Sequence, residues 1–373
     1  MAEQRIIASV SNNYQGDQRV QKQMRSLKKF GFSPEVIATT LRGSPKLNFD
    51  YPVHILQLSN EKGMRMYLEF NLKLFFKLLK IAKKGDILLA NDVDAALPNY
   101  LVSKIKKLPL VFDSHEIFSE LPSLADRKFK KKIWKILESN LLPKMKYFYT
   151  VSEGYADWFE KEYGNRPEII RNVPEISSSK GAEFTVKLPE IDKDERLLIY
   201  QGAINLSRGI DKMIVAMQWI DHAQLWIVGE GPKKSEYEKL TDELRLNQKV
   251  KFIGAVSPAQ LKLITPKADL GFSLEEDLGI SYRYALPNKI FDYMHAGVPV
   301  LGTDLPEIKK TILEYKTGKV VDNHSPERIA NQANELLSEG KEAYAENLRK
   351  AALVFNWANE EKKLQEIFSV FKT

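Results

Sequence analysis

The sequence predicts an α/β protein of two facing Rossmann-like domains, each a parallel sheet with helices on both faces, and an interdomain cleft. The first observation is length, because 373 residues exceed the roughly 250–300 at which a single hydrophobic core stops growing. The second is that short apolar runs alternate with longer amphipathic stretches almost from end to end, which is typical of strand–helix–strand units. The third is that 43% of the residues are hydrophobic, as in ordinary globular chains.

The predicted strands are short apolar runs, six in each half of the chain. In the first half they are Arg5–Val10, Pro34–Thr39, Val53–Leu56, Asp86–Ala90, Leu108–Asp113 and Tyr147–Val151. In the second half they are Leu197–Gln201, Gln224–Val228, Val250–Ile253, Ala268–Ser273, Val298–Gly302 and Gly318–Val321. Ligands of parallel sheets bind beyond the carboxyl ends of the strands, so we expect the functional residues in the loops there.

A polar stretch over residues 172–195 separates the two sets of strands. It contains a Ser-Ser-Ser-Lys-Gly run, which is typical of linkers. We therefore expect one domain over residues 1–175 and a second over residues 176–357.

Composition and charge limit the function classes. The chain has no cysteine, which excludes a disulfide scaffold, thiolate metal sites and cysteine nucleophiles. Its start lacks the apolar core of a signal peptide, and no stretch of about 18 residues is free of charge, so we expect a soluble, cytoplasmic protein.

The net charge of +7 is unevenly distributed along the chain. Residues 1–150 carry 26 basic and 14 acidic side chains, while residues 151–373 carry 30 basic and 35 acidic ones. A basic half is typical of proteins that meet nucleic acid, anionic lipid or phosphorylated substrates, and the alternative is a solvated lysine-rich surface.

The most informative segment covers residues 286–300. It has a proline at its first helical position and a glycine just past its end, which predicts a short helix followed by a strand. Asn288, Lys289 and Asp292 are three or four residues apart, so all three can face one side near the helix N-terminus. Free N–H groups and a lysine suit a diphosphate, and a carboxylate one turn on suits sugar hydroxyls. The alternative is an amphipathic helix with a surface Lys–Asp pair.

Three strand-end loops of the second half carry further candidates. Gly202 follows a strand and allows a close approach of the backbone to a ligand, and Arg208 at the next helix start can hold phosphate, unless it is simply solvent-exposed. A second strand ends in a glycine turn at Gly229. A third ends in three carboxylates that include Glu275 and Glu276, which suit sugar hydroxyls or form a solvated acidic turn.

Three strand-end loops of the first half carry polar side chains as well. Asp17 follows the first strand, where it can cap a helix and pair with Arg19. Asp92 follows the fourth strand, and His115 and Glu116 follow the fifth. A lone histidine is more often structural, but a strand-end position between two carboxylates favours a functional interpretation.

The motifs, taken in order, resemble the retaining glycosyltransferases of family 4 (group 1), which have the GT-B fold. The matching segments are Tyr200-Gln-Gly-Ala203, Val228-Gly-Glu-Gly-Pro232, Phe252-Ile-Gly-Ala-Val256 and Pro287–Val300, together with Asp17-Gln-Arg-Val20 near the start. The resemblance covers nearly the whole chain and implies that the second domain binds a nucleotide-sugar donor. It also implies that a C-terminal helix, residues 358–373, packs back onto the first domain.

The resemblance assigns roles to the donor-side candidates. Asp292 takes the place of the second glutamate of the family's Glu-x7-Glu signature, which holds the ribose, while Asn288 and Lys289 fall at the diphosphate. Arg208 takes the place of the family's phosphate-binding lysine.

Two positions depart from the family pattern. Ala203 replaces an arginine, for which Arg283 can substitute. Tyr284 stands where the first signature glutamate is expected, so Glu275 or Glu276 serves as that acid.

On the acceptor side, the resemblance makes His115 a catalytic residue that lies against the donor sugar across the cleft. Asp17, Arg19, Asp92 and Glu116 are the acceptor-side residues. The implied reaction moves a sugar from a nucleoside-diphosphate sugar to a hydroxyl of a glycan or lipid-linked acceptor, through front-side displacement, in cell-surface polysaccharide or glycolipid synthesis.

No Asp-x-Asp metal clamp is recognisable in the second half, because Asp92 and Asp94 have that spacing but lie in the acceptor half. We therefore expect no metal and no cofactor. Two alternatives stay open at this point. One is a GT-B epimerase acting on the nucleotide sugar, which needs extra acids and bases beside the sugar. The other is a non-enzymatic basic module that binds lipid or nucleic acid.

Two lysine-rich stretches, residues 64–84 and 127–146, account for the basic half and are predicted to be helices. One interpretation is that they rest on an anionic membrane surface, with Trp134 at the level of the headgroups. The alternative is that they pack on the sheet with their lysines in water. The expected partners are a nucleotide sugar, a glycan or lipid-linked acceptor and this inner membrane surface, with no nucleic acid.

Overall fold

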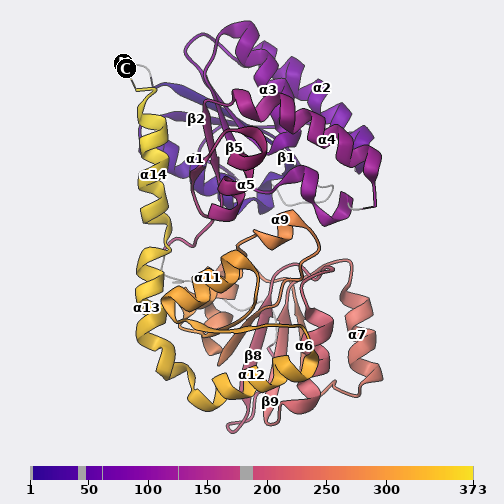
Figure 1. The fold of residues 1–373 in the computed structure, drawn as a ribbon. Helices are drawn as coiled ribbons and strands as arrows, with labels where there is room; N and C mark the ends of the chain where they lie inside the picture. Colours follow the sequence, from indigo (N-terminus) through magenta and orange to yellow (C-terminus); the bar gives the residue numbers. More distant parts are fainter. Residues whose placement is uncertain (1–2, 41–47, 61, 125, 177–187, 373) are drawn as a thin grey trace. The chain divides into compact units, whose positions relative to one another are not determined.

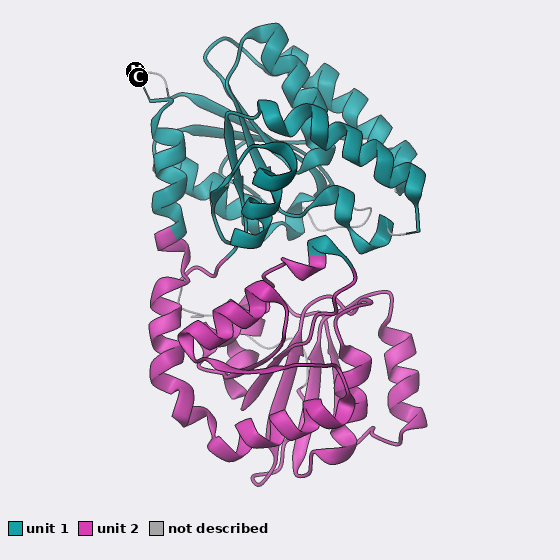
Figure 2. Cartoon of the chain, in the orientation of Figure 1, with its two compact units in different colours: residues 1–172, 279–281, 360–373 teal, residues 173–278, 282–359 magenta. Residues whose placement is uncertain are grey.

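The computed structural model describes residues 3–40, 48–60, 62–124, 126–176 and 188–372. The chain forms two compact units (Figure 2). Unit 1 comprises residues 1–172, 279–281 and 360–373, and unit 2 comprises residues 173–278 and 282–359. The serine-rich run of the expected linker lies outside the described residues.

Unit 1 contains a sheet whose seven described strands are all parallel, in the order β3-β2-β1-β4-β5-β6-β7 (Figure 1). The strands are β1 (Arg5–Asn13), β2 (Ser33–Thr39), β3 (Val53–Ile55), β4 (Ile87–Asn91), β5 (Leu110–Ser114), β6 (Tyr147–Thr150) and β7 (Glu168–Ile169). Its helices are α1 (Gln18–Lys29), α2 (Gly63–Ile81), α3 (Val93–Lys106), α4 (Lys128–Leu141), α5 (Glu153–Tyr163) and, from residue 360 on, α14 (Trp357–Ser369). The end of α14 packs on unit 1, where Phe368 contacts Phe32 and Glu361 accepts a hydrogen bond from Ser26.

Unit 2 contains a second parallel sheet, with six described strands in the order β10-β9-β8-β11-β12-β13. The strands are β8 (Arg196–Gln201), β9 (Ala223–Val228), β10 (Val250–Gly254), β11 (Leu270–Ser273), β12 (Val300–Thr303) and β13 (Gly318–Val321). The helices are α6 (Ile210–Ala216), α7 (Lys234–Glu243), α8 (Pro258–Ile264), α9 (Ile280–Arg283), α10 (Asn288–Ala296), α11 (Pro306–Tyr315), α12 (Pro326–Glu339) and α13 (Ala345–Val354), with α9 shared between the units.

All twelve predicted strands are present, with ends shifted by a few residues. They were recognisable because a parallel sheet covered on both faces buries nearly every side chain of a strand, as in β9, where all six residues are buried. The two-residue strand β7 was missed because it is too short to form an apolar run. Within the described ranges, no helix is both long enough and apolar enough to cross a bilayer.

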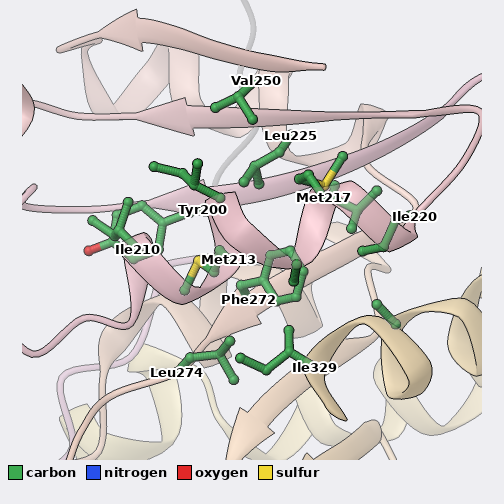
Figure 3. Packing of buried hydrophobic residues seen from close by; sticks show 14 of the residues in the cluster. Tyr200, Ile210, Met213, Met217, Ile220, Leu225, Val250, Phe272, Leu274 and Ile329 are labelled. Carbon is green, nitrogen blue, oxygen red and sulfur yellow. The ribbon is translucent and has the colours of Figure 1, made fainter. Parts of the chain in front are cut away.

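The core of unit 2 anchors the strands that lead into the candidate site (Figure 3). Tyr200 from β8, Leu225 from β9 and Phe272 from β11 are fully buried. They pack with Met213 of α6 and Ile329 of α12 in one apolar cluster. Tyr200 and Phe272 are the last residues but one of their strands. Their packing in the core therefore holds in place the residues from which the following loops begin.

Each sheet has one point where the strand order reverses. In unit 1 it lies between β1 and β4, and in unit 2 it lies between β8 and β11. Loops leave in opposite directions at such a point, and the crevice left at the carboxyl ends of the strands is where open α/β sheets bind ligands.

Candidate functional site

At the point where the strand order of unit 2 reverses, two basic side chains lie against one buried carboxylate. Glu275 lies two residues beyond β11 and is 1% exposed. One of its oxygens lies 2.6 Å from the Lys289 amine and 3.6 Å from the Arg208 guanidinium. The other accepts a hydrogen bond of 2.6 Å from Ser273. The cluster therefore joins three parts of unit 2: the loop just before α6, the end of β11 and the first turn of α10.

The charges of this cluster stabilise one another. Burial by itself raises the pKa of Glu275, but Lys289 and Arg208 outweigh it and lower that pKa below the usual range. Burial likewise lowers the pKa of Lys289, which Glu275 partly offsets. Both cations also face aromatic rings, because the Lys289 amine lies 4.3 Å from the centre of Tyr200 and the Arg208 guanidinium 5.1 Å from that of Tyr282. Lys289 and Arg208 thus lie together beside one carboxylate, which leaves the cluster with a net positive charge. Such a charge suits a diphosphate.

The glycine turns of unit 2 bring backbones together beside this cluster. Gly202 has φ +134°, and a Cβ there would lie 3.7 Å from Cε of Lys289. Gly229 has φ +147°, and a Cβ there would lie 1.9 Å from the carbonyl oxygen of Gly202. The close neighbours of Gly229 are therefore protein backbone, and the contact it permits is the packing of the β9 loop on the β8 loop.

The predicted helix between Pro287 and Gly297 is present as α10, but it begins at Asn288, so Pro287 is its N-cap and not its first helical residue as predicted. Gly297 lies just past its end in the left-handed region, as expected for a C-terminal cap. Asn288 is exposed at its start, while Lys289 is buried against Glu275. Asp292 is partly buried and accepts a hydrogen bond of 2.9 Å from Gln201. Gln201 in turn accepts one from Thr265, so this amide is oriented on both sides.

Two donor-side candidates lie against other partners. Glu276 forms an ion pair with Lys212, whereas Lys289 and Arg208 pair with Glu275. Arg283 pairs with Asp277 at 2.6 Å and its side chain is 52% exposed. Of the two neighbouring glutamates, Glu275 is the one that shares the cluster with Lys289.

A second buried carboxylate organises the strand ends of unit 1. Asp113, the fourth residue of β5, is fully buried and receives two hydrogen bonds from Arg19, of 2.7 and 3.0 Å. Gln23 and His115 also contact it, at 2.6 and 2.9 Å. Arg19 is itself only 3% exposed and donates its third hydrogen bond to the carbonyl of Ile170. Arg19 thus pairs with Asp113, and the sequence-based expectation of a pair with Asp17 was wrong.

His115 lies between two carboxylates. Its Nε2 is 2.9 Å from Asp113 and its Nδ1 is 3.3 Å from Asp92, whose other oxygen accepts the backbone N–H of His115 at 2.7 Å. Burial by itself lowers the pKa of His115, but the two carboxylates raise it to about 9, so the ring is an imidazolium at neutral pH. Burial also raises the pKa of Asp92 to about 7.

Asp94 is the third carboxylate of this group. It is 5% exposed and accepts a hydrogen bond from Ser11 on one oxygen, while the other is buried without a hydrogen-bond partner among the described residues. Burial raises its pKa to about 6.

The remaining acceptor-side candidates lie at the edge of this group. Asp17 caps α1 by accepting the backbone N–H of Val20 at 3.0 Å, as predicted from its position. Its other oxygen accepts a hydrogen bond from Asn12. Glu116 is exposed. Among the residues that the structure describes, no group of three or more His, Asp or Glu side chains is arranged to hold a metal ion.

The two lysine-rich stretches are helices, but Trp134 is not at a surface. The observed helices are α2 and α4, each shorter than the predicted stretch. Trp134 is 4% exposed and packs on Phe118 and Tyr67, with ring centres 4.7 and 5.0 Å apart. The expectation that Trp134 lies at headgroup level was wrong, because its face of α4 is the one that packs on the unit.

Comparisons with known proteins agree with this architecture. Residues 183–353 match the family model described as Glycosyl transferases group 1, and residues 18–175 match the model described as Glycosyltransferase Family 4. The GDP-mannose-dependent alpha-(1-6)-phosphatidylinositol monomannoside mannosyltransferase of Mycobacterium tuberculosis is 30% identical over 205 residues, 50% of this chain and 51% of that protein. The chain spans about half the length of the curated relatives it matches there.

Solved structures show the fold. Sucrose-phosphate synthase from Thermosynechococcus elongatus matches with a TM-score of 0.80 at 16% identity, over 99% of each chain. Anabaena HepE, solved in complex with UDP, matches with a TM-score of 0.71 at 14% identity, over 98% of this chain and 100% of that one. Two parallel-sheet, Rossmann-like domains with these neighbours define a protein of the GT-B fold. The chain belongs to the group 1 glycosyltransferases.

Several residues of the two clusters were not singled out from the sequence. Gln201 and Ser273 orient the donor-side carboxylates, and Asp113 and Gln23 organise the acceptor side. Gln201, Ser273 and Asp113 are polar side chains in the last two positions of buried strands, which is a signal that the sequence does contain. Gln23 lies within α1, and nothing in its local pattern distinguishes it.

Proposed function

We propose that this chain transfers a sugar from a nucleoside-diphosphate sugar to an acceptor hydroxyl, with retention of configuration and without a metal ion. The observation that carries the proposal is the gathering of Lys289 and Arg208 against the buried Glu275 at the reversal point of the second sheet. Two fixed cations suit the charge that develops on a departing diphosphate. Family membership supports the same substrate class, as does the UDP bound by the structurally similar Anabaena protein.

The proposed donor-side roles follow the positions of the side chains. Arg208, Lys289 and the exposed Asn288 at the start of α10 hold the diphosphate, and Asp292 accepts hydrogen bonds from the ribose. Glu275 is the first signature acid, because it shares the cluster with both cations while Glu276 faces Lys212.

In the proposed reaction the bond between the anomeric carbon and the diphosphate oxygen breaks first, and the diphosphate keeps the electron pair. The acceptor oxygen then bonds to the same face of that carbon, and its proton passes to the departing phosphate. His115 is the catalytic residue proposed for unit 1, and as an imidazolium it cannot be the base. The acceptor is a glycan or a lipid-linked glycan of the cell surface, for which the mannosyltransferase relative acting on a phosphatidylinositol monomannoside is a precedent.

Arg208→Ala tests the donor site. Lys289 still neutralises Glu275 in this variant, so the fold should persist while one charge-assisted contact to diphosphate is lost, typically worth roughly 1.5–3 kcal/mol. Titration with UDP, GDP and ADP by calorimetry should show at least one nucleotide that binds the parent and binds the variant roughly tenfold or more weakly. The control is Lys239→Ala, at an exposed position of α7.

A second measurement identifies the chemistry. The nucleotide sugar selected by the titration is incubated with the parent protein and a panel of glycan and lipid-linked acceptors. Release of the nucleoside diphosphate with a new α- or β-linkage that matches the donor supports retaining transfer. Conversion of the nucleotide sugar to an isomer without release of nucleotide would instead identify an epimerase and reject the proposal.

A further inference from the structure

The exposed apolar side chains of unit 1 concentrate on three helices. Nine large apolar side chains are exposed in the described part of this unit, and seven of them lie on α2, α3 and α4. These seven are Leu68, Leu72, Phe76, Leu101, Ile105, Phe129 and Ile136. Leu68, Leu72 and Phe76 are four residues apart and form one stripe along α2, exposed by 64, 52 and 65%. Phe129, at the start of α4, is 75% exposed.

The charge of the same helices is almost entirely positive. Together α2, α3 and α4 contain eleven lysines and arginines but three acidic residues. Asp94 and Glu138 are buried, and the third, Glu69, pairs with Lys73. Two lysines of α4 also pair with acids outside these helices, Lys131 with Glu120 and Lys135 with Glu162. The α2–α4 surface, as we call the exposed side chains of these helices, therefore combines apolar residues with an excess of lysines over acids.

The three helices lie side by side on one layer of unit 1 (Figure 1). They also lead to the acceptor-side carboxylates. Asp92 precedes the first residue of α3, and the side chain of Asn71 on α2 donates a hydrogen bond of 2.8 Å to the carbonyl of Asp94. Tyr67, next to Leu68, is close enough to Asp94 and Asp92 that they help burial raise its pKa to about 12.

We propose that the α2–α4 surface docks on a lipid bilayer with anionic headgroups, so that an acceptor anchored in that bilayer presents its sugar at Asp92. The part about the acceptor rests on the proposed function, whereas the docking does not. The charge favours a polyanion, and the apolar stripe distinguishes a bilayer from a nucleic acid. Leucine and phenylalanine side chains gain free energy by entering the acyl boundary, whereas they add nothing to contacts with phosphates.

Co-sedimentation of the full chain with vesicles tests the proposal. Vesicles of phosphatidylcholine alone are compared with vesicles of phosphatidylcholine and phosphatidylglycerol, at low salt and in about 1 M salt, where the Debye length is about 3 Å. The parent should pellet with the anionic vesicles, less so at high salt, and not with the neutral ones. Because Trp134 is buried, its fluorescence is not a suitable probe of insertion.

Two groups of substitutions separate the apolar from the electrostatic contribution to vesicle binding. Leu68→Ser, Leu72→Ser and Phe76→Ser remove the stripe. Lys128→Glu, Lys130→Glu and Lys132→Glu reverse three charges of α4 and leave the ion-paired Lys131 and Lys135 unchanged. Each group should weaken partitioning roughly tenfold or more. The matched controls are exposed positions of unit 2, which should change nothing: Leu313→Ser with Leu353→Ser, and Lys193→Glu with Lys267→Glu and Lys310→Glu.

Two results of these experiments would reject docking on a bilayer. If the folded parent does not pellet with anionic vesicles at low salt, docking is rejected. If the serine variant binds as the parent does while polyuridylate competes with the vesicles, the surface is a nucleic-acid site and the proposal is also rejected. Titration of the same samples with nucleotide separates this from the donor site, because intact nucleotide binding without vesicle binding counts against the surface alone.

Discussion

The Lys289 amine lies 2.6 Å from a carboxylate oxygen of Glu275, and the two side chains are only 8% and 1% exposed. Lys289 is therefore held in place before any ligand arrives. Arg208 reaches the same oxygen at 3.6 Å and is more exposed, at 26%. The two cations differ accordingly in what their loss does to the protein.

Lys289→Ala should destabilise the fold as well as the site. The change leaves the buried Glu275 charge with a more distant arginine and a serine, and removing one partner of a buried pair costs roughly 3–5 kcal/mol. Chemical denaturation measures the free energy of unfolding directly, and Lys310→Met serves as a surface control.

The double variant Lys289→Met with Glu275→Gln separates stability from binding. It removes both charges and keeps the volume, so most of the lost stability should return. Nucleotide binding should not return, because the cation is still missing. A Lys289→Ala variant as stable as the parent would show that the pair contributes little to the fold.

Asp292→Asn should weaken nucleotide binding and leave the melting temperature almost unchanged. Asparagine keeps an oxygen that can accept the hydrogen bond from Gln201, so the local contact survives. A neutral oxygen binds the two ribose hydroxyls less strongly than a carboxylate does, and the expected loss is about 1 kcal/mol or more. Calorimetry with the selected nucleotide measures it, with Asp242→Asn on α7 as the control. Destabilisation with unchanged nucleotide affinity would make Asp292 a structural residue.

Sequence patterns predicted the fold well because buried parallel strands leave a strong local signal. The helix between Pro287 and Gly297 was predicted equally well, because proline and glycine are typical of the two ends of a helix. The positions of Glu275 and His115 just beyond strand ends were predicted because topology alone brings the carboxyl ends of neighbouring strands together.

The contacts between side chains of different elements could not be predicted to the same extent. Arg19 stands two residues from Asp17, yet it reaches Asp113, which is 94 positions away in the chain. Likewise, the lysine pattern of α4 gave no sign of which face packs, and Trp134 proved to be on the buried one. Partner choice across elements depends on the three-dimensional packing, which local spacing does not contain.

Arg19→Met should both destabilise the fold and raise the pKa of His115. The guanidinium makes three buried hydrogen bonds, so its loss should cost roughly 3–5 kcal/mol. Arg19 also repels the imidazolium, so without it the pKa of His115 should rise above about 9. NMR titration of the His115 ring measures this shift, with Arg25→Met on the exposed side of α1 as the control. An unchanged His115 titration would show that Arg19 affects the histidine only through packing.

The titration of Asp94 should make stability fall with rising pH. In the folded protein burial raises the pKa of Asp94 to about 6, from a usual value of 3.8. Because the folded state then binds a proton that the unfolded state has released, stability decreases as pH rises from about 4 to about 6, and this loss persists above that range.

Asp94→Asn should remove this dependence. Asparagine does not titrate and can still accept the hydrogen bond from Ser11, so the variant should gain stability relative to the parent as pH rises through that window. The full gain corresponds to on the order of 2–3 kcal/mol. Urea denaturation of both proteins at about pH 4.5 and about pH 7.5 measures the difference, and Asp126→Asn, at an exposed position, should show none. If the variant's relative stability were equal at both pH values, the Asp94 carboxyl would titrate near its usual pKa, and its buried, unpartnered oxygen would not be the cause of any pH dependence.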